Sequence, residues 1–230
     1  MLEGPRVVEG ALDRGAHLES LYLGTGTEAS FAELVARARR SGAAIAELKE
    51  GVLEKLGSTV TPQPVLAVTP RVSSRLEDLV PGLVLVGIGL ADPGNVGTMI
   101  RTAEAVGAAG VVLTGATVDP YNPKAVRAST GAIVGTRVVL HEDTAEALEV
   151  LERQGRRRFG AAPSGGSAYS SVSWPHSCAI VLGNEAHGLG PELSEQLDEL
   201  VTVPMVGGES LNVAIAATVL AYAWMQEQTR

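Results

Sequence analysis

Apolar residues in the second half of the chain come in short continuous runs rather than in strict alternation. From Leu83 onward these runs read LVLVGIGL, GVVL, RVVL, RRFGAA, CAIVL and ELVTV. Strands that are covered by helices on both faces carry continuous runs of this kind. The segments between them have helical patterns, over about residues 96–106, 144–154 and 191–197 and from about Leu211 to the end. The pattern predicts a mostly parallel sheet with helices on both faces.

The first part of the chain has a different pattern, with the β-like runs LESLYL, GAAIAEL and PVLAVT between helical segments. The clearest helix is SFAELVARARRSG, in which Ser30 can cap the first turn, Glu33 follows as in a capping box, and Gly42 ends the helix. We therefore expect a small α/β domain over residues 1–69. A segment with a proline near each end, over residues 70–82, is expected to be a linker to the second domain at 83–230.

Composition excludes several classes of protein. The net charge of −8 argues against a protein that coats nucleic acid nonspecifically, although it permits a local basic site. Cys178 lies in an apolar run and is expected to be a buried thiol, and the four histidines are too scattered for a zinc site. No apolar run reaches the roughly 18 residues of a membrane span, and the acidic N-terminal segment is unlike a signal peptide. We expect a cytoplasmic protein without a membrane partner.

The stretch ADPGNVGTMIRTAEAVGAAGVVL follows the first apolar run of the second domain. A dinucleotide loop needs a G-x-G-x-x-G pattern and an acidic residue after the next strand. The glycines here are Gly94 and Gly97, and the next run ends at Thr114 without such an acid. A nucleotide-dependent oxidoreductase is therefore disfavoured. Taken alone, Asn95 would be a helix cap and Arg101 a solvated helix residue.

Two further motifs lie beyond it. In IVLGNEAHGLGPEL, Glu185 follows a buried strand, at the strand end where open α/β sheets bind ligands. In VTVPMVGGESLNVAIAATVLAYAW, a strand is followed by a turn and by a helix near Ser210, whose hydroxyl is a candidate N-cap. This last helix is apolar almost all round, which predicts that it is buried against the sheet or another chain.

Together, the three motifs resemble those of the SpoU/TrmH-type RNA 2′-O-ribose methyltransferases of the SPOUT superfamily. The matching patterns are N-x-G-x-x-x-R, G-N-E-x-x-G-L and V-P-M…S-L-N-V, in the family's order, and the resemblance spans about residues 83–224. It implies a C-terminal domain with a trefoil knot that binds S-adenosylmethionine, and a homodimer that packs through the knotted faces. It also implies that the N-terminal domain is a ribosomal-protein-like RNA-binding domain.

The resemblance assigns roles to particular residues. The catalytic set is Arg101, Asn95, Glu185, Ser210 and Asn212. A guanidinium is a poor base, so we expect Arg101 to orient phosphate and stabilise the developing alkoxide, with Glu185 holding Arg101 or the ribose. No metal is expected, because a methyl sulfonium is already activated. The residues implied in cofactor binding are Ala162, Pro163, Gly183, Gly188, Val203, Met205 and Leu211.

The segment NPKAVRASTGA resembles a family stretch in which we expect Lys124, Arg127 and Ser129 to contact RNA phosphate. The triplet at 156–158, three consecutive arginines, is interpreted instead as a solvated edge. The expected reaction is methyl transfer from S-adenosylmethionine to a ribose 2′-hydroxyl in ribosomal RNA. Two alternatives stay open: methylation of transfer RNA, and a catalytically silent RNA-binding or assembly protein of the same fold.

Overall fold

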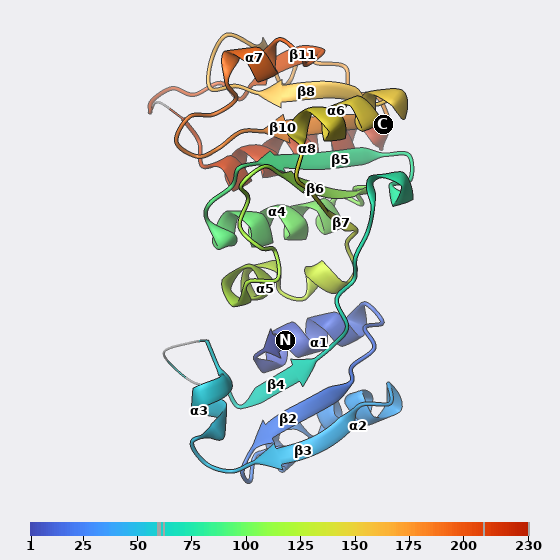
Figure 1. Cartoon of the computed structure of the whole chain (residues 1–230), viewed down its shortest axis with the longest axis vertical. Helices are drawn as coiled ribbons and strands as arrows, with labels where there is room; N and C mark the ends of the chain where they lie inside the picture. The colour runs from blue at the N-terminus through green and yellow to red at the C-terminus, as the bar shows by residue number, and fades with distance from the viewer. Residues whose placement is uncertain (59–60, 62, 209, 230) are drawn as a thin grey trace.

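The computed structural model describes residues 1–58, 61, 63–208 and 210–229. Two units lie one above the other along the long axis of the molecule, the smaller one built from the N-terminal part of the chain (Figure 1). Within the described residues, no helix combines the length and the apolar character that crossing a membrane requires.

The N-terminal unit is a four-stranded sheet in the order β1-β4-β2-β3, with helices packed against it. In β2 (Ser20–Gly24), the side chains of Leu21 and Leu23 are fully buried and alternate with partly exposed ones, as expected for a strand with one covered face. The remaining elements are β1 (Leu2–Glu3), β3 (Ala44–Leu48), β4 (Val65–Val68), α1 (Pro5–Asp13), η1 (Glu28–Phe31), α2 (Ala32–Arg40) and α3 (Val52–Leu56).

The predicted cap of α2 is wrong, while its predicted end is confirmed. Ser30 lies inside the 3₁₀ turn η1, and α2 begins two residues later without a side-chain cap. The short turn places the Ser30 hydroxyl before the helix rather than at its first free N–H groups. At the other end, Gly42 has φ +89°, and the N–H of Ala43 reaches back to the carbonyl of Ala38, which is the usual glycine ending of a helix.

The C-terminal unit is a seven-stranded sheet in the order β7-β6-β5-β10-β8-β11-β9, in which every neighbouring pair is parallel. The predicted parallel sheet is therefore confirmed. Late strands lie between earlier ones, because β10 separates β5 from β8, and β11 separates β8 from β9. The trefoil knot stays a prediction. The strands are β5 (Leu83–Ile88), β6 (Gly110–Thr114), β7 (Val138–His141), β8 (Arg157–Ala161), β9 (Ser167–Ala168), β10 (Cys178–Leu182) and β11 (Glu199–Thr202).

Helices cover both faces of this sheet. One apolar cluster joins β5, β6 and β10 to α4 (Pro93–Ala105) and α8 (Val213–Gln228), and a second joins the opposite face to α6 (Thr144–Arg153). The second cluster also takes in Leu76 and Leu79, so this part of the expected linker packs against the C-terminal unit. The remaining helices are η2 (Leu76–Asp78), α5 (Pro123–Ser129), η3 (Ala132–Val134) and α7 (Pro191–Ser194).

The sequence suggested that the arginine triplet is a solvated edge, and the structure shows that this is wrong for two of the three residues. Arg156 is 3% exposed, and its guanidinium donates hydrogen bonds to the carbonyls of Leu79 and Val80. Arg158 is 7% exposed. Two of the three cations therefore lie inside the unit, where they need acceptors to offset the cost of leaving water.

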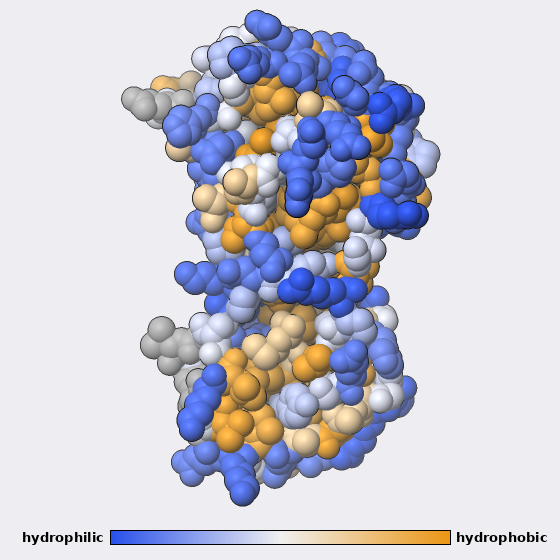
Figure 2. All heavy atoms as spheres, viewed as in Figure 1, coloured by the Kyte–Doolittle hydropathy of each residue, from blue (hydrophilic) through white to orange (hydrophobic). Residues whose placement is uncertain are grey.

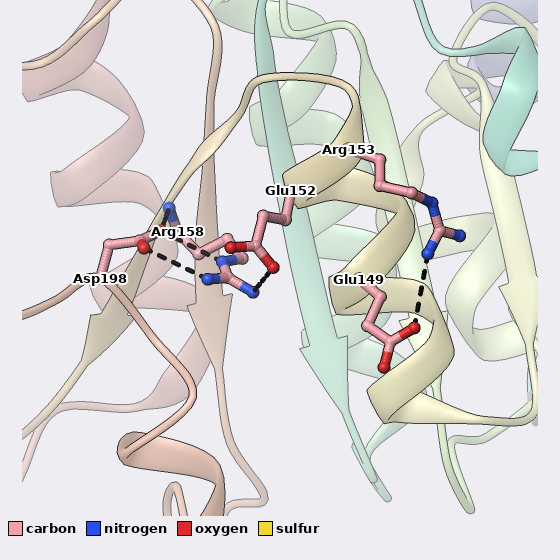
Figure 3. A network of polar contacts seen from close by, with 5 residues as sticks. All are labelled: Glu149, Glu152, Arg153, Arg158 and Asp198. Atoms are coloured by element: carbon pink, nitrogen blue, oxygen red, sulfur yellow. Dashed lines mark hydrogen bonds and ion pairs between the residues drawn. The ribbon is translucent and has the colours of Figure 1, made fainter.

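Arg158 finds its acceptors in two carboxylates that come from different elements (Figure 3). Its Nε and Nη2 donate to the two oxygens of Asp198, at 3.1 and 3.2 Å, and its Nη1 donates to Glu152 of α6, at 3.1 Å. The Arg158 hydrogen bond keeps the pKa of the Asp198 carboxyl below its ordinary value, although burial opposes this. These contacts join α6, β8 and the approach to β11.

We predict that Asp198→Asn lowers the free energy of unfolding at neutral pH by about 1–3 kcal/mol, because Arg158 loses its bidentate carboxylate. The folded-state pKa is lowered, so this stabilisation is present above the ordinary aspartate value of about 4 and is lost as the pH falls through the folded value. Urea unfolding at several pH values measures it, and the difference from the wild type should shrink on acidification. Glu149→Gln, which breaks an exposed pair with Arg153, is the control and should cost at most about 0.5 kcal/mol.

Candidate active site

Three loops meet at the carboxyl edge of the large sheet, because β5, β10 and β11 run in the same direction. Asn184 joins two of them directly. Its Nδ2 donates to the carbonyl of Gly89 at 2.7 Å, and its Oδ1 accepts the N–H of Ala186 at 2.8 Å. Asn184 is a site residue that the sequence motifs do not single out. Its place between a strand-ending glycine and Glu185 was the available signal.

Glu185 connects the loop after β10 to the start of α4. Its carboxylate accepts hydrogen bonds from the N–H groups of Ala91 and Asp92, at 3.2 and 3.3 Å, and from Nδ2 of Asn95, at 3.0 Å. Burial favours the neutral acid, but these donors outweigh it, and the pKa of Glu185 lies below its ordinary value. The carboxylate is therefore ionised at neutral pH.

Asn95 carries the connection on to the third loop. It lies in the first turn of α4 and is 8% exposed, and its Oδ1 accepts a hydrogen bond of 3.0 Å from Nδ2 of Asn212. Oδ1 of Asn212 in turn accepts the N–H groups of Ala214 and Ile215, at 2.9 and 3.3 Å. A continuous chain of hydrogen bonds thus runs from Glu185 through Asn95 to Asn212, and so through all three sequence motifs.

The helix starts differ from those expected. Asp92 is the N-cap of α4, with Oδ1 accepting the N–H of Gly94, and Pro93 takes the first helical position. Proline is favoured there because the N–H it lacks would have no partner within the helix. Asn212, and not Ser210, is the N-cap of α8. Asn95 is therefore not needed as a cap, and its amide is available to the other loops.

A cavity of about 540 Å³ opens beside this chain of hydrogen bonds. Its apolar wall includes Leu182, Val201 and Leu220, whereas Glu185 and Asn212 give it a polar side. The volume lies within the range of about 300–1,000 Å³ that is typical of small-molecule sites. Such a cavity can hold a ligand that has one apolar end and one polar end.

The cavity wall needs glycine at Gly183. A Cβ placed there would lie 2.1 Å from the backbone of Gly188, so the loop after β10 folds back directly onto its own start. Gly188 has φ +63°, a conformation that side chains disfavour. The short backbone-to-backbone contact leaves main-chain groups facing the cavity at the end of a buried strand.

The structure brings most of the predicted site residues together. Ten of them line the cavity: Ala162, Pro163, Gly183, Glu185, Gly188, Val203, Met205, Ser210, Leu211 and Asn212. Asn95 is not part of the lining, but it contacts two residues that are. The roles given to these residues stay predictions, since a shared wall shows proximity and not function.

Arg101 is the catalytic candidate that lies apart. It is exposed on α4, does not line the cavity, and has no hydrogen-bond or ion-pair partner among the described residues. The expected contact between Glu185 and Arg101 does not form within this chain, because the carboxylate is taken by Ala91, Asp92 and Asn95. The Arg101 guanidinium is thus free to meet a group from outside the chain.

The three predicted RNA contacts have different surroundings. Lys124 is exposed in the first turn of α5. Ser129 is fully buried, and its hydroxyl donates to the carbonyl of Val126 at 2.7 Å, so it cannot contact phosphate from there; this corrects the prediction for Ser129. Arg127 pairs with Glu3 of the N-terminal unit, with 3.1 Å between Nη1 and Oε2.

Comparisons with known proteins find relatives for both units. Residues 82–222 match the model of the SpoU rRNA Methylase family, and residues 1–67 match the MRM3-like substrate binding domain. The chain is 36% identical over 176 residues to the 23S rRNA (guanosine(2553)-2′-O)-methyltransferase RlmP of Bacillus subtilis, which covers 76% of this chain and 70% of that protein. It is 31% identical to an uncharacterized tRNA/rRNA methyltransferase of Mycobacterium bovis, over 95% of this chain and 71% of that protein.

Two solved structures have the same architecture. An AdoMet-bound rRNA methyltransferase from Sinorhizobium meliloti superposes with a TM-score of 0.83, at 28% identity over 97% of this chain and 85% of that one. The SpoU methyltransferase AviRb from Streptomyces viridochromogenes, in complex with AdoMet, gives a TM-score of 0.84 at 26% identity, over 99% of this chain and 89% of that one. The fold, the cavity and the matched segments lead to one conclusion: the chain belongs to the SpoU rRNA Methylase family.

Proposed function

We propose that this protein transfers a methyl group from S-adenosylmethionine to a ribose 2′-hydroxyl in ribosomal RNA. The observation that carries the proposal is the 540 Å³ cavity at the carboxyl edge of the parallel sheet, with the Glu185–Asn95–Asn212 chain of hydrogen bonds at its side. The family of the chain supports the reaction, and the relative RlmP, whose name specifies 23S rRNA, supports the substrate class.

The cavity suits S-adenosylmethionine in size and in the character of its walls. Ala162, Pro163 and Leu220 offer an apolar surface for an adenine, and the backbone at Gly183 and Leu211 offers hydrogen-bonding groups. When bound, the cofactor supplies a methyl group activated by the positive sulfur. Two solved relatives whose titles name bound AdoMet support this assignment.

The residues of this chain must position a ribose hydroxyl, which is a very weak acid, and assist the loss of its proton as the oxygen–carbon bond forms. We assign Arg101 to an RNA phosphate and to the negative charge that develops on the attacking oxygen, because it is exposed and has no partner among the described residues. Glu185, Asn95 and Asn212 hold the loops, and Ser210 faces the cavity as a candidate contact for the ribose.

We also propose that the protein is a homodimer. The helices α4 and α8 lie side by side, joined by a 2.8 Å hydrogen bond between the hydroxyls of Thr102 and Thr218. The outer face of α8 is partly apolar, since Ile215 is 53% and Tyr222 is 40% exposed. A second copy of the chain would cover this face, as proposed for the apolar last helix.

We assign residues 1–69 to RNA binding and 83–230 to methyl transfer, in the cytoplasm where ribosomes assemble. Transfer RNA is the second candidate substrate, because a solved structure titled for 2-OH methylation of C/U34 on tRNA superposes at 29% identity. That superposition has a TM-score of 0.61 and covers 65% of this chain. The relative RlmP, whose name specifies 23S rRNA and which matches 76% of this chain, favours ribosomal RNA.

Tritiated S-adenosylmethionine and RNA from cells that lack this protein test the function. We expect label in a 2′-O-methylnucleoside of ribosomal RNA, and Arg101→Ala should lower kcat about 100-fold with cofactor binding retained, because a donor to the developing charge is lost. Arg153→Ala, an exposed cation on the opposite face of the sheet, is the matched control. Label in transfer RNA would instead identify transfer RNA as the substrate. Cofactor binding without any label would favour the silent RNA-binding protein.

Gly183→Ala tests the cavity. The new methyl would meet the Gly188 backbone at 2.1 Å, so the loop must shift, and we expect affinity for S-adenosylmethionine to fall at least about tenfold by calorimetry. Gly190→Ala changes the same loop at a position with no atom within 4 Å of the new Cβ and should bind normally. Equal affinities in two folded variants, compared by thermal unfolding, would remove this loop from the cofactor site.

Asn95→Leu tests the chain of hydrogen bonds. The change removes the donor to Glu185 and the acceptor for Asn212, so we expect a loss of about 1–3 kcal/mol in unfolding free energy and of 10- to 100-fold in kcat/KM. Asp143→Ala removes the N-cap of α6 and should cost about 1 kcal/mol without changing activity. If the two variants lose activity in proportion to stability, Asn95 has no role beyond folding.

A further inference from the structure

The N-terminal unit packs against the C-terminal unit through backbone as well as side chains. A Cβ at Gly131, which has φ +85°, would lie 2.8 Å from the backbone nitrogen of Ala11, and a Cβ at Gly10 would lie 2.6 Å from the carbonyl oxygen of Thr130. Helix α1 therefore lies directly against residues 130–131. One apolar cluster runs through both units without a break, from Leu2 and Val7 to Val126 and Ile133.

Two ion pairs also cross this contact. Arg14, which follows α1 as its C-cap, donates from Nε and Nη2 to the two carboxylate oxygens of Glu104 on α4, with 2.6 Å for the Nη2 bond. Arg127 of α5 lies 3.1 Å from Oε2 of Glu3, whose side chain is only 2% exposed. On the face that Figure 2 shows, the molecule narrows between the units, and hydrophilic residues lie along the narrow part. Charged pairs thus accompany an apolar contact.

Separating the units would be costly in free energy. The Glu3 carboxylate also accepts the backbone N–H of Ser58 at 3.0 Å, so it is built into the N-terminal unit and would lose its cation if the units parted. Removing the Arg127 guanidinium from this carboxylate, which is 2% exposed when the units are joined, opposes their separation. Units joined only by a linker are expected to move relative to each other, and this contact opposes that motion.

We propose that this contact, through Glu3–Arg127 and Arg14–Glu104, fixes the RNA-binding unit relative to the cavity and so sets which ribose reaches it. The inference rests on the proposed function and deepens it. Arg127 is then a positioning residue that acts through Glu3, and not a contact to RNA phosphate. Misplacement by about 1 Å can lower a reaction rate about 100-fold, so a fixed distance between the two units is enough to select a nucleotide.

Glu3→Gln and Arg127→Met distinguish positioning from RNA contact. If Arg127 acts through Glu3, each variant lowers kcat/KM for ribosomal RNA about 10- to 100-fold, the double variant loses no more than either single one, and cofactor affinity is unchanged. If Arg127 contacts phosphate, only Arg127→Met is impaired, and the proposal fails. Asp13→Asn and Arg37→Met break a 2.6 Å pair inside the N-terminal unit and should leave kcat/KM unchanged.

A distance measurement tests the contact between the two units independently of enzymatic activity. Cys178, the single cysteine, is fully buried, and burial raises the pKa of its thiol to about 12, so added cysteines can be labelled selectively. Spin labels at Glu33→Cys on α2 and Ala145→Cys on α6, both exposed positions, report the separation of the units. We expect one narrow distance distribution that broadens in Arg127→Met and in Arg14→Glu, and narrows again when Arg14→Glu is combined with Glu104→Arg.

The distance measurement and the methylation assay test the fixed contact and the proposed function independently. A broad distribution in the unmodified protein, or one that none of the substitutions changes, would overturn the fixed contact even if ribosomal RNA is methylated. Conversely, a protein that methylates no ribosomal RNA but keeps a narrow distribution would lack the proposed function and retain the contact. Thermal unfolding of each variant shows whether a lost signal reflects unfolding.

Discussion

The amide of Asn95 is the contact on which the site depends. It donates to Glu185 and accepts from Asn212, so one side chain near the start of α4 holds loops that follow two other strands. Parallel strands bring their carboxyl ends to one edge of a sheet, but they do not fix the loops there to one another. The buried amide does so, and it leaves a cavity of about 540 Å³ beside the loops it joins.

Elsewhere in the fold, single arginine side chains join separate elements in a similar way. Arg158 holds Asp198 and Glu152 together, and thereby fixes β11, whose end and following loop form part of the cavity wall. Arg127 and Arg14 join the smaller unit to α4 and α5. In each case an arginine connects segments that are distant in sequence. Arg101 and Lys124, in contrast, are exposed to solvent.

Continuous apolar runs were enough to predict the parallel sheet, because burial on both faces leaves a direct trace in residue type. The resemblance carried by the three motifs pointed to ten residues of the cavity wall. The wrong predictions about burial concerned residues whose surroundings depend on distant parts of the chain. The burial of Arg156 and Arg158 needs carbonyls at 79–80 and the carboxylate of Asp198, and the burial of Ser129 depends on tertiary packing. The Ser30 cap failed for a local reason, a 3₁₀ turn before the helix.

The central claim is that this chain methylates a ribose in ribosomal RNA. Mass spectrometry of nucleosides from ribosomal RNA, compared between cells that contain the protein and cells from which it has been deleted, tests that claim most directly. The account predicts that one 2′-O-methylnucleoside disappears on deletion and returns when the protein is restored, with transfer RNA unchanged. Identical 2′-O-methylnucleosides in the two ribosomal RNA samples would contradict it.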